Sequence, residues 1–259
     1  MDTDPTCALS DDPGPARGSP AARLPVVDLA RGLAIVQMIT YHFIYDLTYF
    51  GWLHFDMTRQ PQFIGWRDAI VTQFLLVVGV GIALGEARHR SGARFWRRWC
   101  QIAGAAALVS AASAWLFGPR LIWFGILHFV AVALLLSRRL PALGLWNLLL
   151  GAVLLALGSS VHDARFDPAW VDWIGFAAHK PPTEDYVPLV PWLGVVAIGI
   201  ALGWRWRQSG FALARPLHRL DSAPARGLRW LGSWPLTIYL VHQPILMGML
   251  WLVKSVLAP

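Results

Sequence analysis

Charged residues are scarce in this sequence. Asp, Glu, Lys and Arg together make up 14% of the 259 residues, whereas a soluble domain carries about 25%. Apolar residues make up 56% of the chain, and the mean hydropathy is +0.48. A chain with so little charge is not an ordinary soluble domain, and we expect a membrane protein. The 15 tryptophans fit this expectation, because tryptophan anchors membrane proteins at the lipid–water interface.

The motifs of several other protein classes are missing. The sequence has no internal repeat, P-loop, GxGxxG or zinc-ligand spacing, which excludes the soluble nucleotide-binding folds and gives no reason to expect a metal. It has two cysteines, Cys7 and Cys100, neither in a CxxC pattern, and we expect no disulfide between them. The basic n-region and short h-region of a signal peptide are also missing, so we expect the first apolar helix to remain as an anchor.

The net charge of +7 is not gathered on one polar face. The basic residues sit in short gaps between apolar runs. A nucleic-acid-binding protein needs a basic soluble surface to contact phosphates. We therefore expect no nucleic-acid partner and interpret these residues as topology signals.

The chain divides into a tail and one membrane domain. Residues 1–24 are rich in Pro, Gly, Ala, Ser and Asp, which predicts a disordered cytoplasmic tail. Residues 25–259 contain seven apolar segments long enough, or nearly so, to cross about 30 Å of hydrocarbon. They lie near 26–50, 67–86, 99–117, 121–137, 142–158, 189–206 and 233–253. The sequence therefore predicts an all-α, polytopic bundle of seven transmembrane helices.

Arginine is concentrated in alternate gaps between these segments. The rich gaps lie before the first segment, between the second and third, between the fourth and fifth, and between the sixth and seventh. They hold Arg17, Arg23, Arg88, Arg90, Arg94, Arg97, Arg98, Arg138, Arg139, Arg205, Arg207, Arg215, Arg219, Arg226 and Arg229. By the positive-inside rule, the N-terminus lies in the cytoplasm and the C-terminus outside. We expect a multi-pass protein of the cytoplasmic (inner) membrane, in contact with membrane lipids.

The first apolar segment carries four ionisable residues on one stripe. Asp28, Arg31, His42 and Asp46 fall within about 60° around a helix. Facing lipid, they would cost several kcal/mol, so this stripe should point into the bundle. Arg31 either extends to the membrane surface and pairs with Asp28, or contacts an anion at the inner mouth. Asp46 is either an interfacial residue or orients His42 from one turn away and raises its basicity.

Three further polar residues are expected at the depth of His42. They are Gln73, His128 and His242, each inside an apolar segment. A lone histidine in a membrane helix often makes only a helix–helix hydrogen bond. The occurrence of the set at one level favours a common site.

The polar residues together suggest a path across the membrane. It has a basic inner mouth, histidines at mid-depth, and an acidic, aromatic outer gap over 159–188 that either orders over the site or is an ordinary solvated loop. Thioester chemistry fits these parts. Acyl-CoA carries phosphates that arginines bind, and a histidine can deprotonate an attacking hydroxyl or amine, or take the acyl group itself.

Four stretches resemble the heparan-alpha-glucosaminide N-acetyltransferase catalytic-domain family. They are Arg23–Met38 followed by His42 and Asp46, Phe74–Leu84, Trp123–Phe129 and Ile238–Pro244, and the resemblance covers roughly 23–253. The wider superfamily includes membrane acyltransferases that O-acetylate bacterial polysaccharides. Those enzymes share an arginine and a later histidine in their first helix, here Arg31 and His42. The lysosomal enzyme and the polysaccharide acetylases have more than seven helices, and this chain lacks a large luminal domain.

The resemblance implies transfer of an acyl group, in the first place acetyl, from cytoplasmic acyl-CoA to an extracytoplasmic saccharide or lipid-linked acceptor. His42 would be the base or acyl carrier and Asp46 its orienter. The other expected site residues are Arg31, Arg97 and Arg98 for CoA phosphates, His128, Gln73 and His242 for substrate or the thioester oxyanion, and Arg120, Trp123 and Gln243 for substrate contacts. The alternatives are a transporter or flippase without acyl transfer and a b-type haem protein with two axial histidines. A homo-oligomer is compatible with the sequence.

Overall fold

The computed structural model describes residues 25–85, 92–210 and 221–257. The predicted tail over 1–24, Cys7 and the arginines at positions 17, 23, 88, 90, 215 and 219 lie outside these ranges. The described helices are α1 (Pro25–Tyr49), α2 (Pro61–Gly85), α3 (Gly92–Phe117), α4 (Ile126–Leu136), α5 (Trp146–Ser160), α6 (Leu189–Gln208), α8 (Ala223–Ser233) and α9 (Pro235–Leu257). The described residues contain no β-strand, so the all-α prediction is confirmed.

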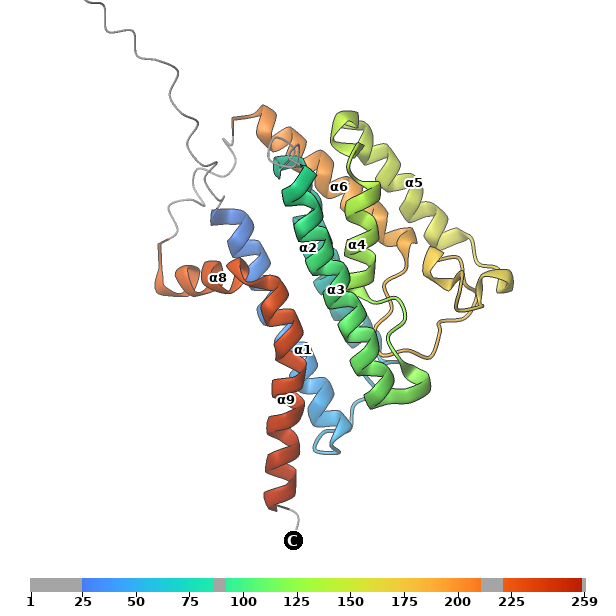
Figure 1. The fold of residues 1–259 in the computed structure, drawn as a ribbon, viewed down its shortest axis with the longest axis vertical. Helices are drawn as coiled ribbons and strands as arrows, with labels where there is room; N and C mark the ends of the chain where they lie inside the picture. The colour runs from blue at the N-terminus through green and yellow to red at the C-terminus, as the bar shows by residue number, and fades with distance from the viewer. Residues whose placement is uncertain (1–24, 86–91, 211–220, 258–259) are drawn as a thin grey trace, which may run out of the picture.

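The long helices alternate in direction along the molecule (Figure 1). α1 begins near the upper end of the view, and α9 ends at the lower end, where the C-terminus lies. α1 starts as its sequence predicts, because Pro25 suits the first helical position and Asp28 in the first turn complements the helix dipole. α8 lies across this arrangement and contacts α1.

Four of the described helices are long and apolar enough to cross a membrane by themselves: α2, α3, α6 and α9. α4 and α5 are apolar but shorter, and α1 has a sufficient length of 25 residues but carries the ionisable stripe. These features make the chain a multi-pass membrane protein. The count of seven spans and the orientation with the N-terminus inside stay predictions.

Three predicted boundaries are wrong by five residues or more, and one helix was not predicted. α2 begins at Pro61 instead of 67, α3 at Gly92 instead of 99, and α4 at Ile126 instead of 121. The stretch before α4 stays non-helical because α3 satisfies its backbone: the Ser110 hydroxyl donates to Ile122 O at 2.7 Å, and Ser113 Oγ accepts from Ile122 N at 2.9 Å. The amphipathic α8 lies in a gap that the sequence showed only as basic.

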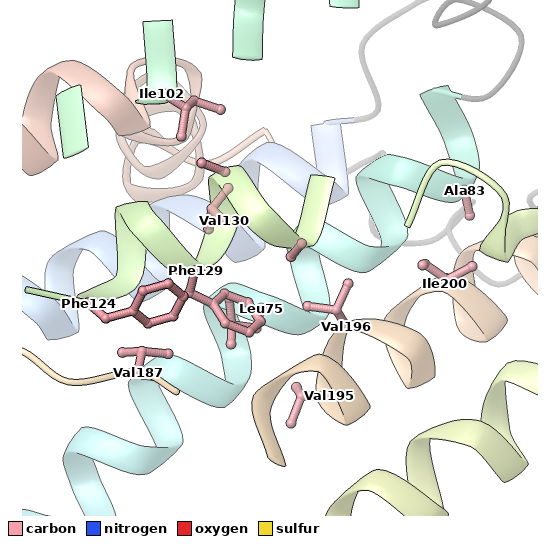
Figure 2. Packing of buried hydrophobic residues seen from close by; sticks show 12 residues of the cluster. Leu75, Ala83, Ile102, Phe124, Phe129, Val130, Val187, Val195, Val196 and Ile200 are labelled. Carbon is pink, nitrogen blue, oxygen red and sulfur yellow. The ribbon is translucent and has the colours of Figure 1, made fainter. Parts of the chain in front are cut away.

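Close backbone contacts organise the bundle around α6. A side chain at Gly199 of α6 would meet the backbone of Leu76 in α2, and one at Gly79 of α2 would meet Val196 O in α6. Small residues at such crossings allow membrane helices to approach closely. The apolar core continues from this crossing to α4. Figure 2 shows Leu75 of α2 and Phe129 of α4 among its buried residues. α6 is therefore the centre of one half of the molecule, and α1 with α9 forms the other.

Candidate active site

The structure brings His42 of α1 and His242 of α9 together. Their ring centroids lie 4.9 Å apart in an edge-to-face contact with an interplanar angle of 77°. The two helices pack against each other (Figure 1), although their histidines lie far apart in sequence. The pair is thus formed by tertiary structure alone.

Hydrogen bonds to the backbone fix the tautomer of both histidines. His42 Nδ1 lies 2.9 Å from Met38 O, and His242 Nδ1 lies 2.7 Å from Tyr239 O. A carbonyl oxygen can only accept a hydrogen bond, so each Nδ1 must carry the hydrogen. The lone pair of each neutral ring is then on Nε2. His242 Nε2 is buried and has no hydrogen-bond partner among the described residues. Both rings therefore offer Nε2 as a base or nucleophile.

The prediction that Asp46 orients His42 is wrong. Asp46 is fully buried, its Oδ1 accepts from Gln243 Nε2 at 2.7 Å, and its Oδ2 bonds to no described residue. Helical side chains lean toward the helix N-terminus, so the ring of His42 reaches the carbonyl of Met38 one turn earlier and not the carboxyl of Asp46 one turn later. Asp46 and Gln243 instead join α1 to α9 next to the histidine pair.

The gap between α5 and α6 is ordered over the end of the bundle where α1 finishes, which is the predicted outer end. Glu184 accepts from the Tyr45 hydroxyl of α1 at 2.9 Å and forms an ion pair with Arg120 at 3.2 Å. Of the two alternatives for this gap, an ordered loop over the site agrees with the structure. Arg120 contacts the loop rather than lying in the bundle interior, and its side chain is half exposed.

Asp185, the next residue, reaches the other histidine helix. Its Oδ2 accepts from Ile126 N at the start of α4 (2.9 Å) and from the Tyr239 hydroxyl of α9 (3.2 Å). Burial raises the pKa of Asp185, and the two hydrogen bonds oppose that rise. The ring of Tyr239 lies 5.7 Å from that of His242. Adjacent loop carboxyls thus hold a tyrosine on each of the two helices that carry the histidine pair.

His128 does not join His42 and His242. It lies in the first turn of α4, because that helix begins at Ile126. The neighbouring Leu127 packs near Tyr239 and Leu240 of α9, and the expectation of a depth similar to that of His42 stays a prediction. Its Nδ1 accepts from Gly125 N at 3.3 Å, and its Nε2 lies 3.0 Å from Ser110 Oγ, whose hydrogen goes to a backbone carbonyl. Both ring nitrogens are engaged, so His128 holds the start of α4 against α3.

An aromatic cavity of about 430 Å³ opens beside His128. Its lining residues are Ser110, Trp123, Phe124, His128, Val132 and Trp173. Trp123 is 55% exposed, which makes it part of the outer wall. The cavity lies at the same end of the bundle as the ordered loop, because Val187 N donates to Phe124 O at 3.1 Å.

Gln73 lies closer to the inner mouth than predicted. Its Nε2 donates to Ala30 O of α1 at 2.9 Å, and its Oε1 accepts from Gln37 Nε2 at 2.8 Å. The expectation that it shares the depth of the histidines is wrong, because α2 begins six residues earlier and places Gln73 one and a half turns further inward. The amide therefore connects α1 to α2 below the histidine pair.

The predicted inner mouth lies around Arg31. Its Nη1 donates to Asp28 Oδ1 at 2.7 Å, which confirms the predicted pairing, and to Gly232 O at the end of α8 at 3.1 Å. Arg97 and Arg98 are exposed near the start of α3. An anion contact by these arginines stays a prediction.

Sequence reasoning missed the tyrosines and the exact loop acids. Tyr45 follows His42 by three positions, and Tyr239 precedes His242 by three, so each pair shares a helix face. That spacing was available as a signal. The partners, Glu184 and Asp185, were visible only as members of an acidic gap, because no local pattern shows which carboxyl reaches which helix.

The histidine pair does not fit a haem between its rings. Two axial histidines lie on opposite sides of the iron, with each nitrogen about 2 Å from the metal, as in other imidazole–metal bonds. Rings in edge-to-face contact at 4.9 Å leave no space for the iron. Across the described ranges, no group of three or more His, Cys, Asp or Glu residues is placed to hold a metal ion.

Comparison with known proteins identifies one family. Neither the curated proteins nor the solved structures contain a match to this chain. The family model described as heparan-alpha-glucosaminide N-acetyltransferase, catalytic, matches residues 23–244, which include both histidines and the ordered loop. The chain belongs to this family of membrane acetyltransferases.

Proposed function

We propose that the protein transfers an acyl group, in the first place acetyl, from cytoplasmic acyl-CoA to a hydroxyl or amine of an extracytoplasmic acceptor, such as a saccharide or a lipid-linked sugar. One observation carries the proposal. His42 and His242 lie in ring contact inside the bundle, and each has its Nδ1 bonded to a backbone carbonyl. Two neutral imidazoles with basic Nε2 atoms suit proton removal from an attacking nucleophile.

The transfer needs one base that later returns its proton. His42 Nε2 takes the proton of the acceptor hydroxyl or amine as the acceptor oxygen or nitrogen attacks the thioester carbonyl. The carbon–sulfur bond then breaks, and the imidazolium gives its proton to the leaving thiolate, so CoA departs as the thiol. Alternatively, the Nε2 lone pair attacks the carbonyl, the carbon–sulfur bond breaks, and the CoA thiolate leaves. The acceptor then attacks the acyl-imidazolium, the carbon–nitrogen bond breaks, and the proton of the acceptor passes to the thiolate. His242, in contact with His42, shares the reacting space.

On the donor side, Arg97, Arg98 and Arg31 are proposed to bind the phosphates of CoA. Guanidinium groups bind phosphate through paired hydrogen bonds. Arg97 and Arg98 are exposed, whereas Arg31 is also engaged by Asp28 and α8 and therefore shapes the mouth as well. From Arg31 to His42 the helix rises about 16 Å. Gln73, bonded beside Ala30, is proposed to lie along this donor path.

On the acceptor side, we place Arg120, Trp123, His128 and Gln243. The first three border the ordered loop or the aromatic cavity at one end of the bundle. Gln243 follows His242 and bonds Asp46. Aromatic walls with a few polar groups are typical of small-molecule sites. Membrane lipids surround the bundle, and a lipid-linked acceptor could approach from them.

The test is acyl transfer by purified protein in detergent or liposomes. With labelled acetyl-CoA, we expect release of CoA thiol and a loss of about a hundredfold or more in turnover for His42→Ala. His162→Ala, which changes an exposed histidine of the outer loop, is the matched control and should keep wild-type turnover. Equal turnover by His42→Ala and the wild type would contradict the proposal, and so would solute movement across liposomes without any consumption of acetyl-CoA.

A further inference from the structure

Asp46 is a buried carboxyl that forms no ion pair with any of the described residues. Its side chain is fully buried, and its one hydrogen bond comes from the neutral amide of Gln243. No arginine or lysine of the described chain pairs with it, and its Oδ2 has no partner there. An unpaired carboxylate inside a membrane bundle costs several kcal/mol, so such a group takes up a proton instead.

Gln243 has the complementary unmatched atom. Its Nε2 donates to Asp46 Oδ1 at 2.7 Å, while its buried Oε1 finds no donor in the described residues. The carboxyl and the amide thus share one hydrogen bond, and each keeps one unsatisfied oxygen. Two buried acceptors without a donor are unfavourable, and one added hydrogen between them satisfies both.

We propose that Asp46 carries a proton on Oδ2 and donates it to Gln243 Oε1, forming a neutral, doubly hydrogen-bonded acid–amide pair that joins α1 to α9. The Asp46–Gln243 pair lies one turn beyond His42 on α1 and directly after His242 on α9. α9 is largely exposed and also contacts α3, α8, Leu127 of α4 and Asp185, but this pair is the side-chain hydrogen bond nearest to the two rings, so it sets their separation. Asp46 is therefore a positioning residue.

The neighbouring titratable groups agree with a neutral pair. α1 contributes His42 and Tyr45, and α9 contributes Tyr239 and His242. Both histidines use Nδ1 on backbone carbonyls, and Tyr45 donates its hydroxyl to Glu184. None of these groups donates a hydrogen to Asp46 in the described structure, which leaves Gln243 as its partner.

The test compares two replacements of Asp46. Asn can reproduce the pair, because its amide N–H replaces the proposed O–H, whereas Ala cannot. We expect Asp46→Asn to unfold at nearly the wild-type temperature, and Asp46→Ala and Gln243→Leu to unfold at clearly lower temperatures. The influence on catalysis rests on the proposed function: turnover of Asp46→Asn should exceed that of Asp46→Ala by about tenfold or more.

Infrared spectroscopy detects the protonated carboxyl of Asp46 directly and does not depend on catalytic turnover. The difference spectrum between wild type and Asp46→Asn should contain the carbonyl band of a protonated carboxyl, and this band should shift in deuterated water. The inference would be overturned if the difference spectrum contained a carboxylate band instead. It would also be overturned if Asp46→Asn and Asp46→Ala lowered the unfolding temperature equally. If the wild type shows no acyl transfer, the proposed function fails, while the infrared and thermal results still decide the acid–amide pair.

Discussion

At His42 and His242, the backbone selects the basic nitrogen. Each ring leans back along its helix and meets a carbonyl of the preceding turn. A carboxylate can do the same for a histidine base, and it adds charge to the site. Here the carbonyls of Met38 and Tyr239 fix the tautomer without a charge, which suits a site within the membrane. The carboxyls of this region serve the helix contacts instead.

Replacing Asp185 tests how single side chains hold the loop. Asp185→Ala removes the acceptor for Ile126 N and the Tyr239 hydroxyl, and we expect a loss of about 1–3 kcal/mol in unfolding free energy. Asp185→Asn keeps an oxygen for both donors and should lose much less. Thermal unfolding of the purified variants measures the difference. If Asp185→Ala unfolds at the same temperature as the wild type, the loop is not held in place through this residue.

The difference in stability between the wild type and Asp185→Asn should depend on pH, because the pKa of Asp185 is shifted in the folded protein. Burial raises that pKa above its ordinary value of 3.8, so the folded protein keeps the proton to higher pH than the unfolded chain does. The resulting stabilisation is complete below pH 3.8 and is lost as pH rises through the raised pKa. The unfolding temperature of the wild type minus that of Asp185→Asn should therefore fall with rising pH. A difference that rises with pH would contradict the expected sign.

At the scale of elements, several helix pairs approach closely at glycines, and two of these contacts bear on the core and on the site. Gly79 and Gly199 bring α2 and α6 into backbone contact, and Gly32 and Gly232 do so for α1 and α8. In lipid, such close packing replaces the hydrophobic effect as the force between helices. The second contact also places Gly232 O within reach of Arg31. Small residues thus support both the core and the inner mouth.

The α2–α6 contact predicts the outcome of a steric change. In Gly199→Val the new side chain would meet the backbone of Leu76 and Gly79, neither of which can move aside cheaply. We expect a loss of about 1–3 kcal/mol or failure to fold, measured as thermal stability and yield of monodisperse protein. Gly104→Val is the control, because nothing lies within 4 Å of its Cβ position. Similar behaviour of the two variants would contradict close packing at Gly199.

At the scale of the whole molecule, one loop connects the two halves. Glu184 contacts α1, and Asp185 contacts α4 and α9. The loop begins after α5 and leads into α6, at the end of the bundle where α1 finishes. The two ends of the bundle therefore differ in construction. Arginines and the crossing helix α8 form one end, and an ordered acidic loop forms the other.

The predicted membrane orientation can be tested on intact cells. In a background with Cys7 and Cys100 replaced by serine, we expect His162→Cys to react with an impermeant thiol reagent added outside. Arg139→Cys should react only after the membrane is opened. Both positions are exposed, so access to the reagent depends on the side of the membrane. The reverse pattern would place the N-terminus outside.

The sequence predicted the helical class and an apolar helix in each of the seven segments, because apolar runs are a local property of the chain. It predicted the family through four short stretches of similar residues. It also foresaw that the ionisable stripe of the first helix faces inward, since lipid would penalise the alternative. The predicted starts of α2 and α4 were wrong for local reasons. α2 already includes Pro61–Trp66, ahead of Arg67 and Asp68, and serines of α3 keep the start of α4 unwound. Neither effect shows in hydropathy.

The sequence by itself determined that this chain enters the membrane as helices and carries histidines there. Burial of apolar side chains and the cost of lipid-facing charge are properties of each segment alone. Only the tertiary structure decided that His42 pairs with His242, that backbone carbonyls set their tautomers, and that Asp46 bonds Gln243. The histidine pair and the Asp46–Gln243 bond are contacts between helices that are distant in sequence, whereas each tautomer is set by a carbonyl one turn earlier in the same helix. The partners in the contacts between helices follow from how the helices cross, which no periodicity along a single segment specifies.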